Sequence, residues 1–164
     1  MSHPPKELWR ITVGPAWSSF VSVNNYLFTQ EQRGEEEAVV CYESETGRQV
    51  WEKKWTSRFF EALGGLGPRS TPAYADGSIY ALGADGVLVK LDVHDGAIVW
   101  QADVRQSSSR SEAPMWGFSA SPLVVNALVI VHAGRKSDKG VLDYSWPHGG
   151  YRALQAQIID GDIV

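Results

Sequence analysis

Residues 91–100 read LDVHDGAIVW, and residues 42–51 read YESETGRQVW. The two stretches align without gaps: an apolar or aromatic residue opens each, a polar turn ends in Gly, and Val-Trp closes each at Trp51 and Trp100. A self-similar unit of this kind indicates a repeat architecture, so the repeat period decides the fold class.

A second repeated feature extends the unit. Each of three stretches starts with Ser or Thr, continues as a short apolar strand, turns, and returns as a second apolar strand. They are SFVSVNNYLF at 19–28, TPAYADGSIY at 71–80 and SPLVVNALVI at 121–130, so their starts are 52 and 50 residues apart. Trp9, Trp51 and Trp100 recur at intervals of 42 and 49 residues. A period in the forties with short strands and many turns is typical of a β-propeller blade.

The turns within the units favour tight hairpins. Asp-Gly pairs tolerate the positive φ that two-residue hairpin turns require. They occur at 76–77, 85–86, 95–96 and 160–161. The best-defined blade runs from Pro72 to Trp100, with strands expected near residues 73–74, 79–82, 87–91 and 97–102. No stretch of ten or more residues has convincing helical periodicity, so we expect very little helix.

The repeat divides the chain into approximate units at residues 9–51, 52–100 and 101–150, with the start of a further unit at 151–164. The predicted fold is therefore all-β, a partial β-propeller of about three to four four-stranded antiparallel blades. Because a closed propeller needs at least four blades, an open stack leaves apolar faces and strand edges uncovered. We therefore expect a truncated product, part of a larger propeller, or a half that associates with another chain or a second copy.

Composition excludes several classes of protein. The 164 residues carry a formal net charge of −4 without a clustered basic face, so we expect neither nucleic acid nor an anionic membrane as a partner. The longest apolar stretch, residues 123–131, is far shorter than the roughly 18 residues of a membrane-spanning helix. Residues 1–10 contain no secretion signal, which leaves a cytoplasmic protein or a chain whose true start is missing. The single cysteine, Cys41, excludes a disulfide scaffold.

The two aligned units resemble the motif of the pyrroloquinoline-quinone-like (PQQ-like) β-propeller repeat, and this resemblance covers nearly the whole chain. The stretches 8–10, 14–20, 29–42, 61–72 and 116–122 are similar to a bacterial BamB-like subgroup within the quinoprotein alcohol dehydrogenase-like superfamily. The resemblance implies a full ring of blades and export to the periplasm or cell envelope. BamB-like relatives take part in outer-membrane protein assembly, so the resemblance also implies a scaffold or binding role of that kind.

The same resemblance implies roles for particular residues. Gly47 and Trp51, and likewise Gly96 and Trp100, match the structural repeat in which the Trp packs between neighbouring blades. Quinoproteins of this fold stack their quinone on a disulfide between adjacent cysteines and use a calcium site with an Asp base. Because Cys41 stands alone and is predicted to be an inert buried thiol, PQQ is not supported, and we expect no cofactor.

Candidate ligand residues lie in stretches predicted to be loops at the rim of the blades. These stretches are EQRGEEE at 31–37, the glycine-rich residues 64–70, the polar connection at 105–113, and residues 116–122, which are among the stretches similar to the subgroup. If the rim binds a ligand, we expect contacts from Glu31, Arg33, Arg69 and Trp116. The acidic residues at 31 and 35–37 could instead line a cation site, since carboxylates suit hard metals, but a solvated loop is the favoured interpretation. The four His residues lack metal-ligand spacing, so we expect no metal ligand, and we assign no catalytic residue.

Two functions follow from this sequence. The first is a non-catalytic scaffold or binding module that presents blade loops to a protein partner or a small ligand. The alternative is a fragment of a PQQ-dependent oxidoreductase. An enzyme of that kind needs converging polar groups that hold its cofactor, and the sequence offers neither a cysteine pair nor a clear metal set. The scaffold is therefore favoured.

Overall fold

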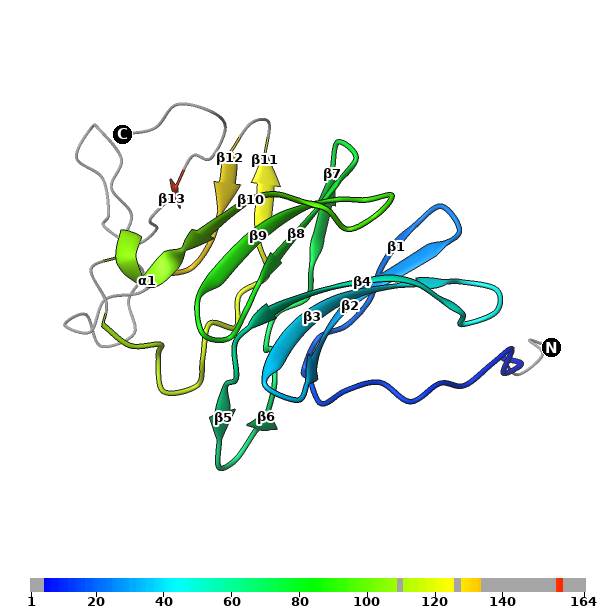
Figure 1. The fold of residues 1–164 in the computed structure, drawn as a ribbon, viewed down its shortest axis with the longest axis horizontal. Helices are drawn as coiled ribbons and strands as arrows, with labels where there is room; N and C mark the ends of the chain where they lie inside the picture. The colour runs from blue at the N-terminus through cyan, green and yellow to red at the C-terminus, as the bar shows by residue number, and fades with distance from the viewer. Residues whose placement is uncertain (1–4, 109–110, 126–127, 134–155, 158–164) are drawn as a thin grey trace.

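The computed structural model is built almost entirely of antiparallel sheets placed side by side (Figure 1). It describes residues 5–108, 111–125, 128–133 and 156–157. Within these ranges the one helix is α1 (Val104–Ser107), a single turn at the end of the second sheet. No helix in the described ranges has the length and apolar character needed to cross a membrane. The prediction of an all-β partial propeller is confirmed.

The first sheet has four strands in sequential order. They are β1 (Val21–Val23), β2 (Tyr26–Arg33), β3 (Glu36–Glu43) and β4 (Gln49–Thr56). β2 and β3 pair without interruption up to Arg33 opposite Glu36. The prediction that residues 31–37 form a loop is therefore wrong. Continuous pairing of the two long strands leaves a two-residue turn between them, and Glu31 and Glu37 lie within strands.

The second sheet repeats the first and follows the strand prediction closely. Its strands are β7 (Ala73–Ala75), β8 (Ser78–Leu82), β9 (Val87–Asp92) and β10 (Ile98–Asp103). Their bounds differ from the predicted ones by at most one residue at either end. The β7–β8 turn has Asp76 and Gly77 at φ 44° and 75°, the positive φ expected of an Asp-Gly hairpin. Short apolar runs and turn chemistry therefore define this blade locally.

The remaining elements lie between and after these sheets. A short hairpin, β5 (Phe60–Glu61) with β6 (Gly65–Leu66), stands in the connection between them, where residues 64–70 were predicted to form a loop. The third sheet contains β11 (Leu123–Val125), β12 (Leu128–Ile130) and β13 (Ala156–Gln157). β11 and β12 confirm the strands predicted within residues 121–130. Beyond Ala133, the predicted third unit and the start of the further unit at 151–164 lie outside the described residues, apart from β13.

Each junction between sheets contains its own apolar core. The first joins one face of the first sheet to the second sheet through Phe28, Val39, Cys41, Trp55, Ile79, Ala81, Val89 and Leu91. The other face of the second sheet meets the third sheet and its preceding connection through Tyr80, Leu82, Leu88, Val104, Phe118, Val129, Val131 and Ala133. Burial of both faces of a sheet by its neighbours is the packing expected of stacked blades.

A Trp packed on a turn glycine recurs along the stack. A Cβ added at Gly96, where φ is 72°, would lie 2.7 Å from Trp51, so the indole needs a residue without a side chain there. The Trp51 indole N–H also donates to the Val93 carbonyl at 3.1 Å. Trp9, in the extended segment 5–17, lies on Gly47 in the same way, 2.6 Å from where a Cβ would be. The segment thus packs on the first sheet as the first sheet packs on the second.

Candidate functional site

The connections between sheets gather at one end of the molecule, at the bottom of Figure 1. A sheet with four antiparallel strands returns the chain to the end from which it started, so every connection between sheets leaves from the same end. That end, here called the loop end, consists of the β2–β3 and β8–β9 turns and the two connections that follow β4 and β10. The opposite end, called the turn end, carries the β1–β2, β3–β4, β7–β8 and β9–β10 turns.

Glu31 and Arg33 form one polar cluster on the outer face of the first sheet. The Glu31 side chain is 1% exposed, and its Oε1 accepts hydrogen bonds from the Tyr42 hydroxyl at 2.7 Å and from Arg33 Nη2 at 3.1 Å. Its other oxygen accepts the backbone N–H of Gly14. Burial, followed by the bond to Glu31, raises the pKa of Tyr42. These partners show that Glu31 ties the N-terminal segment to the first sheet.

Glu37 spans the first junction and is fully buried. Its Oε1 accepts the backbone N–H of Ala84 in the second sheet at 3.2 Å. Burial raises the pKa of the carboxyl to about 7, although the Ala84 amide, Ser57 and Trp55 act in the opposite direction. The interpretation of this acidic stretch as solvated is therefore wrong for Glu31 and Glu37. Each carboxylate is buried because a backbone amide distant in sequence donates to it.

The neighbouring Glu35 remains exposed and pairs with Arg58 at 3.1 Å. Since Glu31, Glu35 and Glu37 bond to three different partners, they do not converge on one point. Within the described residues, no group of three or more His, Cys, Asp or Glu side chains is placed to hold a metal ion. The described part of the acidic stretch therefore provides no cation site.

Arg69 holds the β5–β6 hairpin in place. Its guanidinium donates to the Gly65 carbonyl at 2.6 Å and to the Gly64 carbonyl at 3.3 Å, and it lies over the Phe59 ring at 5.2 Å. The carboxylate of Glu61 lies 3.5 Å away. These groups leave the Arg69 side chain only 7% exposed. The side chain therefore fixes the conformation of the loop and does not face solvent.

Two glutamines, which the sequence analysis did not single out, anchor the same connection. Gln30 Nε2 donates to both the carbonyl and the hydroxyl of Ser70 at 2.9 Å, and Ser70 donates in turn to the Leu82 carbonyl at 2.6 Å. Gln32 Nε2 donates to the Ser57 carbonyl at 2.9 Å. The polar run Gln-Glu-Gln-Arg at the end of β2, a largely buried strand, could have indicated that these side chains have buried partners.

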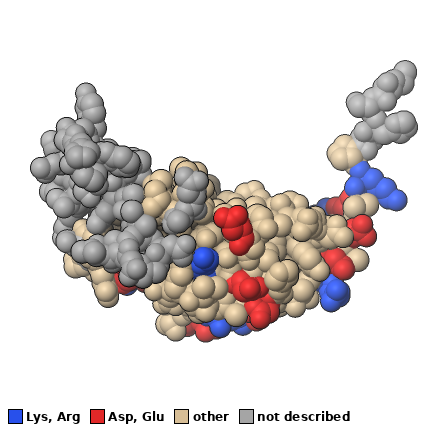
Figure 2. Space-filling model, turned by 90° about the horizontal axis from the view of Figure 1, so that it is seen from above, with Lys and Arg blue, Asp and Glu red and all other residues tan. Residues whose placement is uncertain are grey.

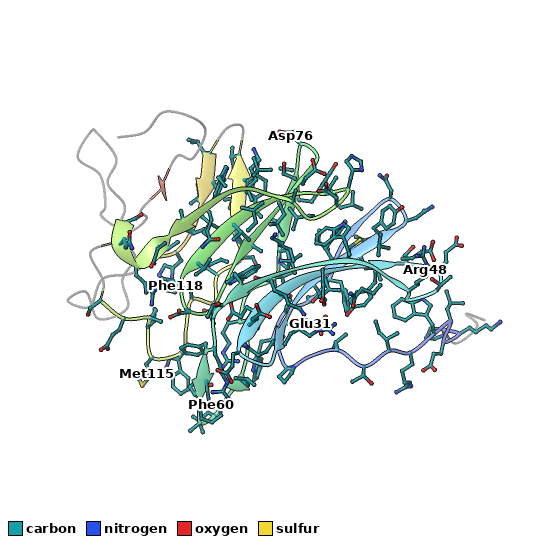
Figure 3. The ribbon with its side chains drawn as sticks, viewed as in Figure 1. Glu31, Arg48, Phe60, Asp76, Met115 and Phe118 are labelled. Atoms are coloured by element: carbon teal, nitrogen blue, oxygen red, sulfur yellow. The ribbon has the colours of Figure 1, made fainter. Side chains whose placement is uncertain are left out.

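Exposed apolar side chains gather on this anchored framework. The loop-end patch consists of Trp17, Phe60, Leu63, Met115 and Trp116, all exposed. The Trp17 indole donates to the Gly64 carbonyl at 2.7 Å, which places it against the hairpin. The connection that carries Met115 and Trp116 packs beside the first, since a Cβ at Gly117 would lie 3.1 Å from the Phe59 ring. Figure 3 shows Phe60 and Met115 at the same end of the molecule.

The four predicted ligand residues therefore separate into different environments. Glu31 and Arg33 lie together behind the N-terminal segment, Arg69 is buried under the hairpin, and Trp116 is 49% exposed in the patch. Of the four, Trp116 is the side chain most available to a partner.

Repeated antiparallel sheets, Trp-on-Gly contacts and a shared loop end define a partial β-propeller of the PQQ-like repeat class. The model of the family described as "Outer membrane protein assembly factor BamB" matches residues 5–142. This chain belongs to that family.

Individual relatives agree with this assignment. A protein of Aliivibrio fischeri named "Outer membrane protein assembly factor BamB" is 34% identical over 56 residues, which make up 34% of this chain and 14% of the relative. The quinohemoprotein alcohol dehydrogenase ADHIIG of Pseudomonas putida HK5 superposes with a TM-score of 0.52 at 19% identity, over 77% of this chain and 18% of its own. A europium-containing methanol dehydrogenase superposes with a TM-score of 0.51 at 20% identity, over 74% of this chain and 20% of its own. The two dehydrogenase structures show the fold, and the chain spans no more than a fifth of any of these three relatives.

The residues of this chain do not fit the quinone site that the fold family implies. The sequence contains one cysteine, Cys41, so no pair of adjacent cysteines exists in it. Cys41 is buried in β3 within the first junction, as predicted for an inert thiol, and burial raises its pKa to about 12. Such a thiol stays protonated and is therefore a poor nucleophile.

Proposed function

We propose that this chain is a non-catalytic β-propeller scaffold that binds a protein partner through its loop end in the cell envelope. The observation that carries the proposal is the loop-end patch. Contiguous apolar surface on connections between elements marks interaction sites, because a solvated monomer gains nothing from exposing it. Two Trp and a Phe are also among the residue types that dominate binding energy at protein interfaces.

The framework beneath the patch supports this function. The Gln30–Ser70 and Arg69–Gly65 bonds fix the hairpin that presents Phe60 and Leu63. A surface held in one conformation before binding loses less conformational entropy when a partner docks. The buried polar residues at the loop end therefore serve the patch by fixing its shape.

The chemistry of the partner follows from the patch and the family. We expect a protein segment with apolar side chains, supplied by a component of outer-membrane protein assembly, since that is the process named for the family. We also expect the chain to act in the periplasm without a quinone cofactor. The alternative of a PQQ-dependent oxidoreductase fragment is disfavoured by the lone, buried Cys41.

Site-specific photocrosslinking tests the proposal. A benzophenone amino acid at Phe60 is compared, in the native host, with the same group at Val99, an exposed residue of β10 away from the loop end. We expect a Phe60-specific adduct with an outer-membrane assembly protein, which Trp116→Ala weakens without changing the thermal unfolding of the chain. Equal adducts at both positions, or none at Phe60, would overturn the proposal.

A further inference from the structure

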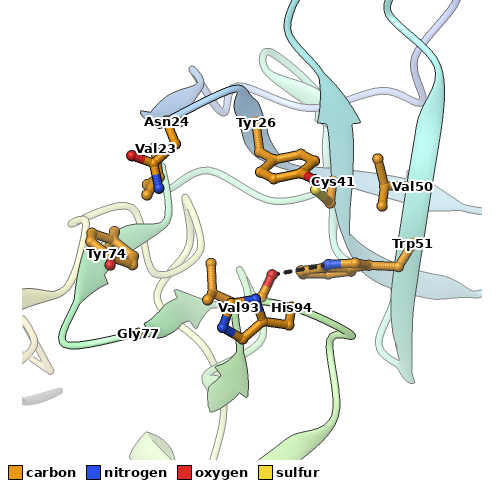
Figure 4. Close-up of a pocket in the computed structure, with 10 residues that line it drawn as sticks. All are labelled: Val23, Asn24, Tyr26, Cys41, Val50, Trp51, Tyr74, Gly77, Val93 and His94. Carbon is orange, nitrogen blue, oxygen red and sulfur yellow. Dashed lines mark hydrogen bonds between the residues drawn. The ribbon is translucent and has the colours of Figure 1, made fainter.

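The turn end contains a cavity that is separate from the loop-end patch. It has a volume of about 170 Å³ and lies at the first junction, between the β1–β2 turn and the β7–β8 turn. Figure 4 shows Tyr26, Tyr74 and Trp51 around the cavity, with Cys41 behind Tyr26. Val50 and His94 complete much of the lining. The cavity is thus lined by aromatic rings contributed by both sheets.

The second sheet shows which residue occupies the position equivalent to Cys41 there. Cys41 pairs with Phe28 in the first sheet, and Lys90 pairs with Tyr80 at the matching register of the second. The Phe28 and Tyr80 rings lie 5.6 and 6.1 Å from the repeat Trp of their own sheets, so the two aromatic pairs correspond. Lys90 is therefore the structural counterpart of Cys41.

Lys90 supplies its sheet with a cation. Its Nζ lies 5.6 Å from the centroid of the Tyr80 ring, within range of a cation–π interaction. The Cys41 side chain has three fewer heavy atoms than that of a lysine and carries no charge. The first sheet thus keeps an aromatic pair beside this position, Phe28 and Trp51, and lacks the ammonium group. Of this pair, Trp51 lines the cavity.

We propose that the cavity binds a small organic ammonium compound, whose cationic group lies against the rings of Tyr26, Tyr74 and Trp51. Aromatic faces attract alkylammonium ions, and recognition of quaternary ammonium by several rings is a known use of this interaction. Among the described residues no Asp, Glu, Lys or Arg lines the cavity, so it offers a hard metal ion no carboxylate, and His94 is its titratable nitrogen base.

Size and surrounding charge agree with this ligand class. An apolar cavity of about 150 Å³ admits benzene in another protein, so the volume here suits a trimethylammonium group. The view from the turn end shows a largely uncharged surface on which Asp and Glu are scattered, with Lys and Arg among them (Figure 2). With a net charge of −4, the chain attracts cations overall.

A matched pair of probes tests the charge requirement. Choline and its neutral isostere 3,3-dimethylbutan-1-ol have the same shape, so a difference in their affinity reports the charge alone. Binding is followed by the NMR signal of the Trp51 indole N–H, whose partner Val93 also lines the cavity. We expect choline to shift this signal at millimolar concentration and the alcohol to bind about tenfold more weakly. Equal affinities, or no shift with choline at tens of millimolar, would overturn the proposal.

Variants locate the binding. Tyr74→Ala removes an exposed ring and should weaken choline binding several-fold, whereas Tyr26→Phe keeps its ring and should preserve it. Cys41→Lys places an ammonium group where the second sheet has Lys90 and should abolish binding. Phe60→Ala, at the loop end, is the matched control and should change nothing. Unchanged affinity in Tyr74→Ala would overturn the assignment even if Cys41→Lys failed to fold.

Discussion

The two ends of the first junction hold the same pair of sheets together by different chemistry. At the turn end Trp51 packs on Gly96, and at the loop end the buried carboxylate of Glu37 accepts the Ala84 amide. The apolar contact is repeated by Trp9 on Gly47, while the carboxylate is not. The stack is therefore built from a repeated apolar contact, and individual junctions add polar contacts of their own.

Loss of the repeated contact should have the largest effect. Trp51→Ala removes a large ring from the first junction and leaves a cavity that the rigid sheets cannot close. We expect the free energy of unfolding to fall by about 3–5 kcal/mol, measured by chemical denaturation. Trp17→Ala, at an exposed indole of the loop-end patch, is the control and should cost far less. A similar loss of unfolding free energy in both variants would show that a Trp packed between sheets contributes no more than an exposed one.

Glu37 should make stability depend on pH. Its folded pKa of about 7 lies above that of an unfolded glutamate, so the folded state binds the proton more tightly. The associated stability is present in full below about pH 4.5 and is lost as the pH rises through about 7, a change of about 3 kcal/mol. Glu37→Gln stays neutral and should remove this part of the pH profile. A variant with the wild-type profile would contradict the assignment.

Glu31 should affect the N-terminal segment more than the junction. Glu31→Ala leaves the Gly14 N–H and the Tyr42 hydroxyl without their acceptor, a loss of about 1–3 kcal/mol. Hydrogen exchange should increase in residues 9–17 first, while the strands of the second sheet keep their protection. Uniform loss of protection through both sheets would show that the segment is not a separate unit.

The exposed ion pair should matter least. Glu35 and Arg58 lie 3.1 Å apart at the surface of the loop end. Glu35→Gln should change the free energy of unfolding by less than about 0.5 kcal/mol, since exposed pairs contribute little. It is also the matched control for Glu37→Gln, because the two positions differ in burial and not in chemistry. A pH profile altered by Glu35→Gln would weaken the argument from Glu37.

The fold was predictable because its determinants are local and recur. Asp76 and Gly77 fix a hairpin by themselves, and two short apolar runs within residues 78–92 set the strands that follow the turn. The Trp and Gly positions could be read from their spacing before any contact was known. The two glutamates Glu31 and Glu37 were misinterpreted because their partners are distant in sequence and do not recur.

Glu31 and Glu37 belong to an acidic run that resembles a solvated loop in sequence. Their burial depends on amides at Gly14 and Ala84, 17 and 47 residues away, which no local pattern reveals. At the second junction Gly86 holds the position of Glu37 in the aligned repeat, and the Phe118 ring packs there instead. A contact that occurs once cannot be found by comparing repeats. The loop-end patch was missed in the same way, apart from Trp116, because its members come from three separate stretches.

The Trp9 contact has a mechanical consequence. Segment 5–17 is attached by separate bonds, among them Trp9 to Ser44, Gly14 to Glu31, and Trp17 to Pro68. A tension applied at the N-terminus loads these bonds one after another, whereas the neighbouring strands share the load across a ladder of bonds. Under a pulling force the segment therefore detaches at low force and lengthens the chain while the first sheet stays intact.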